Sequence, residues 1–133
     1  MVKKYKTRRA SEVDSRRFAV KAKQYRSAMQ AALTQELWDA AVSNGVHAVI
    51  LMANALTARD SGEYYIGQDH GQAADYLEYV EGADAASPSN QMRQIVDLKG
   101  LAEYESRACI EKEATSATKR VDRFFSWAEM RMP

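Results

Sequence analysis

The sequence has few of the residues that build disulfides, turns or metal clusters. Its 133 residues include one cysteine, Cys109, which excludes an internal disulfide and a cysteine-based zinc site. Two prolines and six glycines are few for a many-turned fold, so an all-β architecture is disfavoured. There is no glycine-rich phosphate loop, no G-x-S-x-G and no H-E-x-x-H. The common signatures of nucleotide hydrolases, serine hydrolases and zinc proteases are therefore missing.

We expect no membrane span, because the most apolar run of the sequence is short. This run, residues 46–56, contains His47 and Asn54. The basic N-terminus is not followed by an apolar segment, so we do not expect a signal peptide. The composition, 46% apolar and 28% charged, is ordinary for a soluble domain. We therefore expect a cytoplasmic protein without membrane contact or cofactor.

Charge is distributed unevenly along the chain. Residues 1–26 hold ten lysines and arginines against two acids, a net charge of +8, and the other residues hold nine basic and sixteen acidic side chains, a net charge of −7. Such an asymmetry is typical of a basic surface for a polyanion, and Arg16 and Arg17 are candidate RNA contacts within it. The alternative is a solvated tail and a charged first helix that neutralise the acidic remainder.

Apolar residues recur at helical spacing in four long segments and one short one. We expect long helices over residues 13–33, 35–59, 90–109 and 112–130, and a short helix over residues 71–80. Ser11 and Thr34 are the predicted N-caps of the first two helices. Residues 1–10 are predicted to be a flexible basic leader, and residues 81–89 an exposed linker. The predicted fold is all-α: residues 11–133 form one antiparallel up-and-down bundle.

One predicted helix contains an unfavourable residue. Gly100 falls inside the segment 90–109, where a glycine costs about 1 kcal/mol relative to alanine. We expect this cost to be offset by close helix packing or by a ligand near the backbone. Phe125 and Trp127 lie off the apolar stripe of the last helix. They either pack on a partner subunit or widen the core.

Two motifs make the order of these features more specific. The loop 67–71 reads Gly-Gln-Asp-His-Gly, and residues 98–104 read Leu-Lys-Gly-Leu-Ala-Glu-Tyr. With a basic first helix, an apolar second helix and an alanine-rich last helix, the chain over residues 12–132 resembles the HEPN superfamily (higher-eukaryote and prokaryote nucleotide-binding domains), in its bacterial branch. The resemblance implies a HEPN-like bundle that commonly forms a homodimer.

The resemblance also implies a choice of functions. Many HEPN proteins are metal-independent ribonucleases of toxin–antitoxin or phage-defence systems, and others are non-catalytic domains that bind RNA or dock a protein. The catalytic families use an arginine, a polar residue after it and a histidine about five positions on. Here Lys99, Gly100 and Tyr104 stand at those positions. Tyrosine is a poor general base at neutral pH, and lysine lacks the bidentate fork of arginine.

The histidines offer further candidates. His70, with Asp69 before it, is an acid–base candidate that could lie over Lys99 and Tyr104; the alternative is that Asp69 merely caps a helix opened by His70. His47 is interpreted as a buried or interface histidine. A metal site is not expected, because no standard ligand spacing is present.

These residues define two hypotheses. In the first, the chain binds RNA or nucleotide phosphate through Lys99, Asp69, His70, Arg16 and Arg17, and Lys99, Tyr104 and His70 are its catalytic candidates. In the second, it is a non-catalytic dimer that docks an antitoxin or another protein. The sequence leaves open whether the protein is an enzyme.

Overall fold

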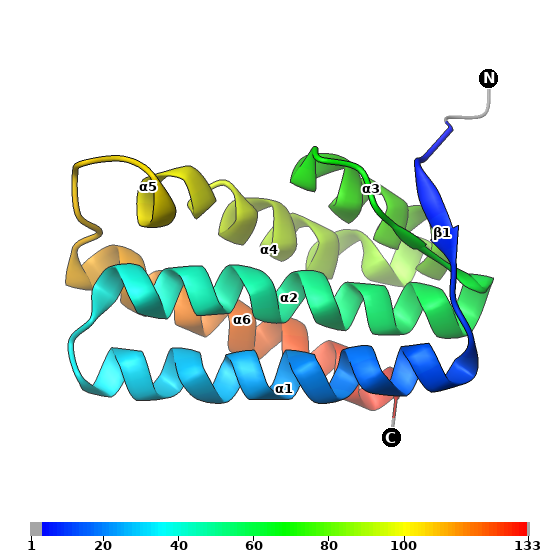
Figure 1. Cartoon of the computed structure of the whole chain (residues 1–133), viewed down its shortest axis with the longest axis horizontal. Coiled ribbons are helices and arrows are strands. Elements are labelled where there is room, and N and C mark those ends of the chain that lie inside the picture. The colour runs from blue at the N-terminus through cyan, green and yellow to red at the C-terminus, as the bar shows by residue number, and fades with distance from the viewer. Residues whose placement is uncertain (1–3, 133) are drawn as a thin grey trace.

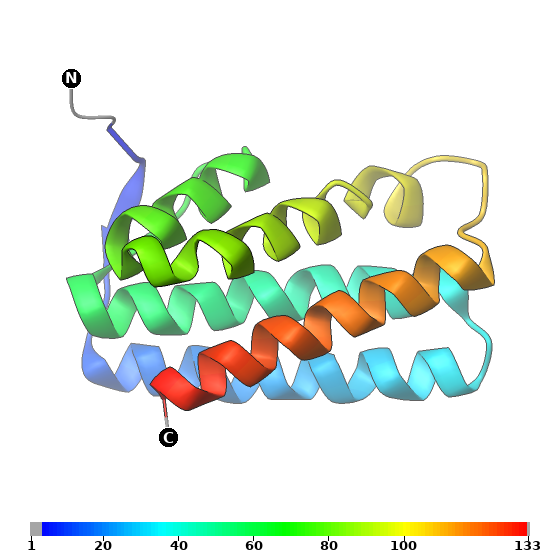
Figure 2. The same cartoon turned by 180° about the vertical axis from the view of Figure 1, so that it is seen from behind.

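The computed structural model describes residues 4–132 and is almost entirely helical (Figures 1 and 2). This confirms the predicted all-α class, to which a small two-stranded sheet is added. The elements follow in the order β1 (Thr7–Arg9), α1 (Glu12–Thr34), α2 (Trp38–Ser61), β2 (Glu63–Tyr65), α3 (His70–Glu81), the 3-10 helix η1 (Ala83–Ala85), α4 (Ala86–Val96), α5 (Lys99–Glu103) and α6 (Glu111–Arg131). Helices α1 and α2 run antiparallel, α6 crosses them on one side, and α3 to α5 lie over α2 (Figures 1 and 2).

Helix α1 begins where the sequence predicts. The Ser11 hydroxyl accepts a hydrogen bond from the Asp14 backbone N–H, and the Asp14 carboxylate accepts one from the Ser11 N–H, at 3.1 and 2.8 Å. This reciprocal pair satisfies two N–H groups at the helix start. The predicted cap at Thr34 is wrong: Thr34 is the last residue of α1, and its hydroxyl donates to the carbonyl of Gln30. The second helix starts later, at Trp38, without a side-chain cap.

Helix α2 is the centre of the bundle. A line of its small and β-branched residues, including Val42, Val46 and Val49, is fully buried. Gly45 permits a close approach, because a Cβ there would lie 3.1 Å from both the sulfur of Met29 on α1 and a methyl carbon of Val121 on α6. By length and composition α2 could also cross a membrane, but most of its apolar stretch is buried inside the bundle, as in the core helix of a soluble protein.

The final helix closes the core. Phe124 and Phe125 of α6 are both fully buried, and Trp127 packs edge-on against Phe124. Phe125 therefore widens the core face, the second of the two roles considered for it. The observed burial of α2 and of Phe125 within one chain removes the need for a second subunit to cover them.

The segment between α3 and α6 differs most from expectation. The predicted exposed linker 81–89 is wrong, because η1 and the first turn of α4 occupy it and Ala85, Pro88 and Ser89 are buried. Proline is compatible with a first helical turn, where its missing N–H has no partner to lose. The predicted helix 90–109 is also wrong: α4 ends at Val96, and α5 forms a separate short helix that ends at Glu103.

Part of the predicted leader is ordered. Thr7–Arg9 pairs antiparallel with Glu63–Tyr65, with Arg8 opposite Tyr64. Tyr5 packs against Tyr76 of α3, with ring centroids 5.2 Å apart. Residues 4–10 are therefore held beside the segment that comes after α2, instead of forming a flexible arm. Residues 1–3 of the predicted leader lie outside the described residues.

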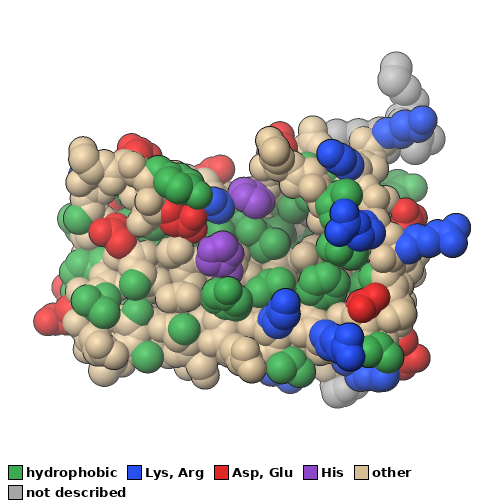
Figure 3. Space-filling view, viewed as in Figure 1, with side chains coloured by type: hydrophobic (Ala, Val, Ile, Leu, Met, Phe, Trp, Pro, Cys, Tyr) green, Lys and Arg blue, Asp and Glu red, His purple; other side chains and the backbone are tan. Residues whose placement is uncertain are grey.

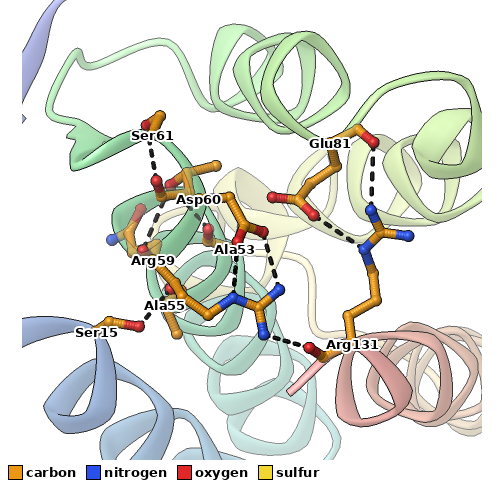
Figure 4. A network of polar contacts seen from close by, with 10 residues as sticks. Ser15, Ala53, Ala55, Arg59, Asp60, Ser61, Glu81 and Arg131 are labelled. Carbon is orange, nitrogen blue, oxygen red and sulfur yellow. Dashed lines mark hydrogen bonds and ion pairs between the residues drawn. The ribbon is translucent and has the colours of Figure 1, made fainter. Parts of the chain in front are cut away.

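A polar network joins the C-terminal ends of α2, α3 and α6 (Figure 4). Arg59 binds the carboxylate of Asp60 at 2.8 and 2.9 Å and also donates to the backbone carbonyl of Arg131. Arg131 in turn donates to a carboxylate oxygen of Glu81 at 2.9 Å. The Glu81 side chain is only 1% exposed, so this network places an ionisable group in the interior.

Candidate functional site: a groove beside two histidines

The two sequence motifs meet in space. A hollow of about 470 Å³ lies between the start of α3 and the α4–α5 junction; we call it the His70–Lys99 groove. Its lining comprises Gln68, Asp69, His70, Gly71, Val96, Asp97, Lys99, Gly100 and Tyr104. Of the sequence-predicted site residues, it brings together Asp69, His70, Lys99 and Tyr104.

The start of α3 fixes one wall of the groove. The Asp69 carboxylate accepts hydrogen bonds from the backbone N–H groups of Gly71 and Gln72, at 2.9 and 3.3 Å. Asp69 is thus the N-cap of a helix that opens at His70, and this is the structural alternative considered for the pair. Gly67 is needed next to this cap, because a Cβ there would lie 2.1 Å from the Tyr65 hydroxyl.

Helix α5 supplies the cation. The Lys99 ammonium donates to the Glu103 carboxylate at 3.0 Å and to the Tyr104 hydroxyl at 3.4 Å, and it lies 4.9 Å from the centre of the Tyr104 ring. The hydrogen bond to Glu103 raises the pKa of Lys99, so its charge is maintained. Tyr104 itself is 77% exposed.

Gly100 does not have the role expected from the sequence. It lies at the second position of the short helix α5, and a Cβ there would meet only a carboxylate oxygen of Glu105, at 3.6 Å. Neither a neighbouring helix nor a close backbone approach requires glycine at this position.

His47 joins the site, although its sequence context suggested a buried or interface residue. Its side chain is 42% exposed, and its Nε2 lies 3.5 Å from the second carboxylate oxygen of Glu103. The Ser43 hydroxyl donates to the same oxygen at 2.9 Å. Burial opposes ionisation of Glu103, but the hydrogen bonds from Lys99 and Ser43 outweigh it and lower the pKa of this carboxyl group. Glu103 is therefore an anion shared by Lys99 and His47.

The sequence signal for His47 and Glu103 is weak but present. Ser43 and His47 are four residues apart, so they lie on one face of α2 and interrupt its apolar surface. Glu103 follows Lys99 at the same spacing. Neither pair indicates that Ser43, His47 and Lys99 meet at the Glu103 carboxylate, because the sequence does not reveal that α2 and α5 are neighbours.

The two histidines of the chain lie near one another on one face of the molecule (Figure 3). Burial lowers the pKa of His70, and the neighbouring Lys99 and His47 side chains lower it further. His70 is therefore neutral at pH 7 and can accept a proton or donate a hydrogen bond. An ammonium and a neutral imidazole that line one groove can bind an oxyanion together, and the imidazole can transfer a proton next to it.

The other candidate residues lie elsewhere. Arg16 and Arg17 are on α1, where they line a different hollow, and Arg16 pairs with Glu12 at 3.1 Å. Cys109 is unsuited to nucleophilic chemistry, because burial raises its pKa to about 12. Among the residues that the structure describes, no group of three or more His, Cys, Asp or Glu side chains is placed to hold a metal ion.

Comparison of the chain with family models, with curated proteins and with solved structures finds no match. The resemblance to the HEPN superfamily thus depends on the residues quoted above.

Proposed function

We propose that the chain is a HEPN-like domain that binds a phosphate group of RNA or of a nucleotide in the His70–Lys99 groove. The observation that supports this most is that Lys99 of α5 and His70 of α3 line one groove, while the Glu103 carboxylate links Lys99 to His47 of α2. We further propose, from the resemblance, that it acts in the cytoplasm as a homodimer within a toxin–antitoxin or phage-defence system.

A phosphate would become the third hydrogen-bond partner of Lys99. The ammonium has three donors and now contacts Glu103 and Tyr104. A phosphate oxygen in the groove would take the third donor, and neutral His70 would donate to a second oxygen. The exposed Tyr104 ring offers a surface on which a base can stack.

Local charge limits the affinity of such a site. Asp69, Asp97 and Glu103 lie around the single lysine, and their negative charges offset much of the attraction between Lys99 and a phosphate. Protonation of His70 would add positive charge to the groove and strengthen the attraction. We therefore expect binding that strengthens as the pH falls below neutrality, together with a salt dependence from the basic residues over β1 and the first half of α1 (Figure 3).

The same groups could also support cleavage. Attack of a ribose 2′-hydroxyl on the adjacent phosphate requires a base, an acid and a cation near the phosphorane oxygens. Neutral His70, His47 beside the Glu103 carboxylate, and Lys99 are the three groups in those roles. Tyr104, the residue at the motif's histidine position, serves in this arrangement as a hydrogen-bond partner of Lys99.

The test is binding of a fluorescent single-stranded RNA, measured by anisotropy at several salt concentrations and at two pH values. Replacing Lys99 or His70 by alanine should weaken binding about tenfold, as expected for the loss of one charge-assisted hydrogen bond. Lys119→Ala, at an exposed lysine on α6, is the matched control and should bind like the wild type. Equal affinity in all four proteins would contradict the proposal, and RNA fragments on a gel would show whether cleavage accompanies binding.

A further inference from the structure

A second surface, away from the His70–Lys99 groove, combines apolar side chains with positive charge. Two hollows of about 410 and 350 Å³ lie on either side of Val20 and Arg16 of α1. The first extends along α1 from Val13, and the second reaches Met52 of α2 and Met132 after the last turn of α6. Together they form one groove, which we call the α1–α6 groove.

The apolar part of this groove is exposed. Val13 and Val20 are 45% and 56% exposed and lie seven residues apart on the same side of α1. That spacing corresponds to about 10 Å along the helix, or two turns of a helix packed against it. The methionines at the far end have flexible side chains that adapt to an inserted group. The groove thus has the apolar spacing that a partner helix requires.

The edges of the groove are basic. Arg16, Arg17, Lys21, Lys23 and Arg59 line it, and Glu129 is the acidic residue among the lining side chains. Lys21 and Lys23 form no ion pair with any residue between 4 and 132. The pair between Arg16 and Glu12 is largely exposed, so it contributes little and a partner carboxylate can replace Glu12.

We propose that the α1–α6 groove binds an acidic amphipathic helix of a protein partner. Apolar residues of that helix would pack on Val13, Val20 and Met132, and its carboxylates would pair with the lysines and arginines at the edges. The part of α1 between Val13 and Gln24 is about 16 Å long, which is enough for three turns of the partner.

Three other occupants fit less well. RNA would leave the aliphatic surface uncovered, because none of the lining residues is an aromatic on which bases stack. A second copy of the chain in a two-fold contact would bring the same lysines and arginines face to face. A lipid surface requires more protruding apolar side chains than Val13 and Val20 provide on α1.

The probe is a dye-labelled amphipathic peptide of about 18 residues with leucines at helical spacing and glutamates elsewhere, long enough to form a helix on binding. A scrambled peptide of equal composition tests the pattern, and a peptide with lysines in place of glutamates tests the charge. We expect the patterned acidic peptide to bind at least about tenfold tighter than either control, with an affinity that falls as salt is added.

Protein variants locate the binding. Val20→Asp and Lys23→Glu should each weaken binding of the acidic peptide by about tenfold, while Lys119→Glu, elsewhere on α6, should change it less than about twofold. Val20 is exposed, and an unchanged melting temperature of Val20→Asp would separate lost binding from lost folding. Val20→Ala keeps part of the apolar contact and should have a smaller effect.

Several results would overturn the proposal. One is equal binding of patterned and scrambled peptides, and another is peptide binding that Val20→Asp leaves intact. Vesicles of phosphatidylcholine and phosphatidylserine whose binding is lost in Val20→Asp, while peptide binding is unaffected, would assign the groove to a lipid. The same result with an oligouridine would assign it to RNA. A dimer in sedimentation that Val20→Asp dissociates would assign it to a second copy.

Discussion

The buried carboxyl group of Glu81 makes the stability of the fold depend on pH around neutrality. One of its oxygens accepts from Arg131 at 2.9 Å, and the other is buried next to Asp60 (Figure 4). Burial is the main cause that raises the pKa of Glu81 to about 7, the neighbouring Asp60 carboxylate adds to it, and Arg131 opposes it. In the folded state, therefore, Glu81 keeps its proton to a higher pH than an exposed glutamate does.

The sign of the effect follows from the two pKa values. The unfolded chain releases the Glu81 proton near the ordinary value of 4.5, and the folded protein releases it only near 7. Between these values the folded state binds more protons, so stability falls as the pH rises and the loss is complete above 7. At 1.36 kcal/mol for each unit of pKa, the expected loss between about pH 5 and pH 8 is about 2 to 3 kcal/mol.

Glu81→Gln tests this reasoning, because the amide reproduces the protonated carboxyl group. Its oxygen can accept from Arg131, and its NH₂ group can donate to Asp60. Urea unfolding at several pH values should show a variant close to the wild type near pH 5 and more stable by about 2 kcal/mol near pH 8. Glu36→Gln, which removes an exposed carboxylate from the α1–α2 turn, should keep the wild-type pH dependence. The same decline with pH in Glu81→Gln would refute the assignment.

Three further substitutions test the packing and the local structure of the site. Gly45→Val should lower the free energy of unfolding by about 2 to 3 kcal/mol, because the valine side chain would press on Met29 and Val121. Gly100→Ala, at an open helical position, should raise the free energy of unfolding by up to about 1 kcal/mol. Thermal melts in which Gly45→Val is as stable as the wild type, or Gly100→Ala is less stable, would contradict this packing. Asp69→Ala should cost about 1 kcal/mol through loss of the α3 cap, with Gln68→Ala as the neutral neighbour in the same melts, and equal stability of the two would disprove the cap.

The periodic parts of the fold follow from the sequence. The spacing of apolar residues indicates α1, α2 and α6, and Ser11 and Gly62 mark true helix ends because each has the local chemistry of a cap. The α4–α5 break escapes this approach, because Ile95, Leu98 and Ala102 continue one helical stripe across it. Pro88 misleads in a different way, because proline is typical of a linker but here occupies the first turn of a buried helix.

The candidate site is predictable only in part. The loop 67–71 and the segment 98–104 each stand out as motifs, and the resemblance suggests that they share a function. The role of His47 depends on α2 lying beside α5, and that arrangement is a consequence of packing in the whole bundle. The raised pKa of Glu81 depends on three helix ends meeting, so no local pattern in the sequence indicates it.

The central claim, that a phosphate binds in the His70–Lys99 groove beside the two histidines, can be tested on the imidazoles themselves. With two histidines in the chain, NMR spectra of the imidazole Cε1–H groups contain two signals, which His47→Ala and His70→Ala would assign. On titration with a short RNA, both signals should shift with one common affinity, and the pKa of His70 should rise because a nearby phosphate favours its protonated form. RNA that binds the protein while both histidine signals and both titration curves stay unchanged would contradict the claim.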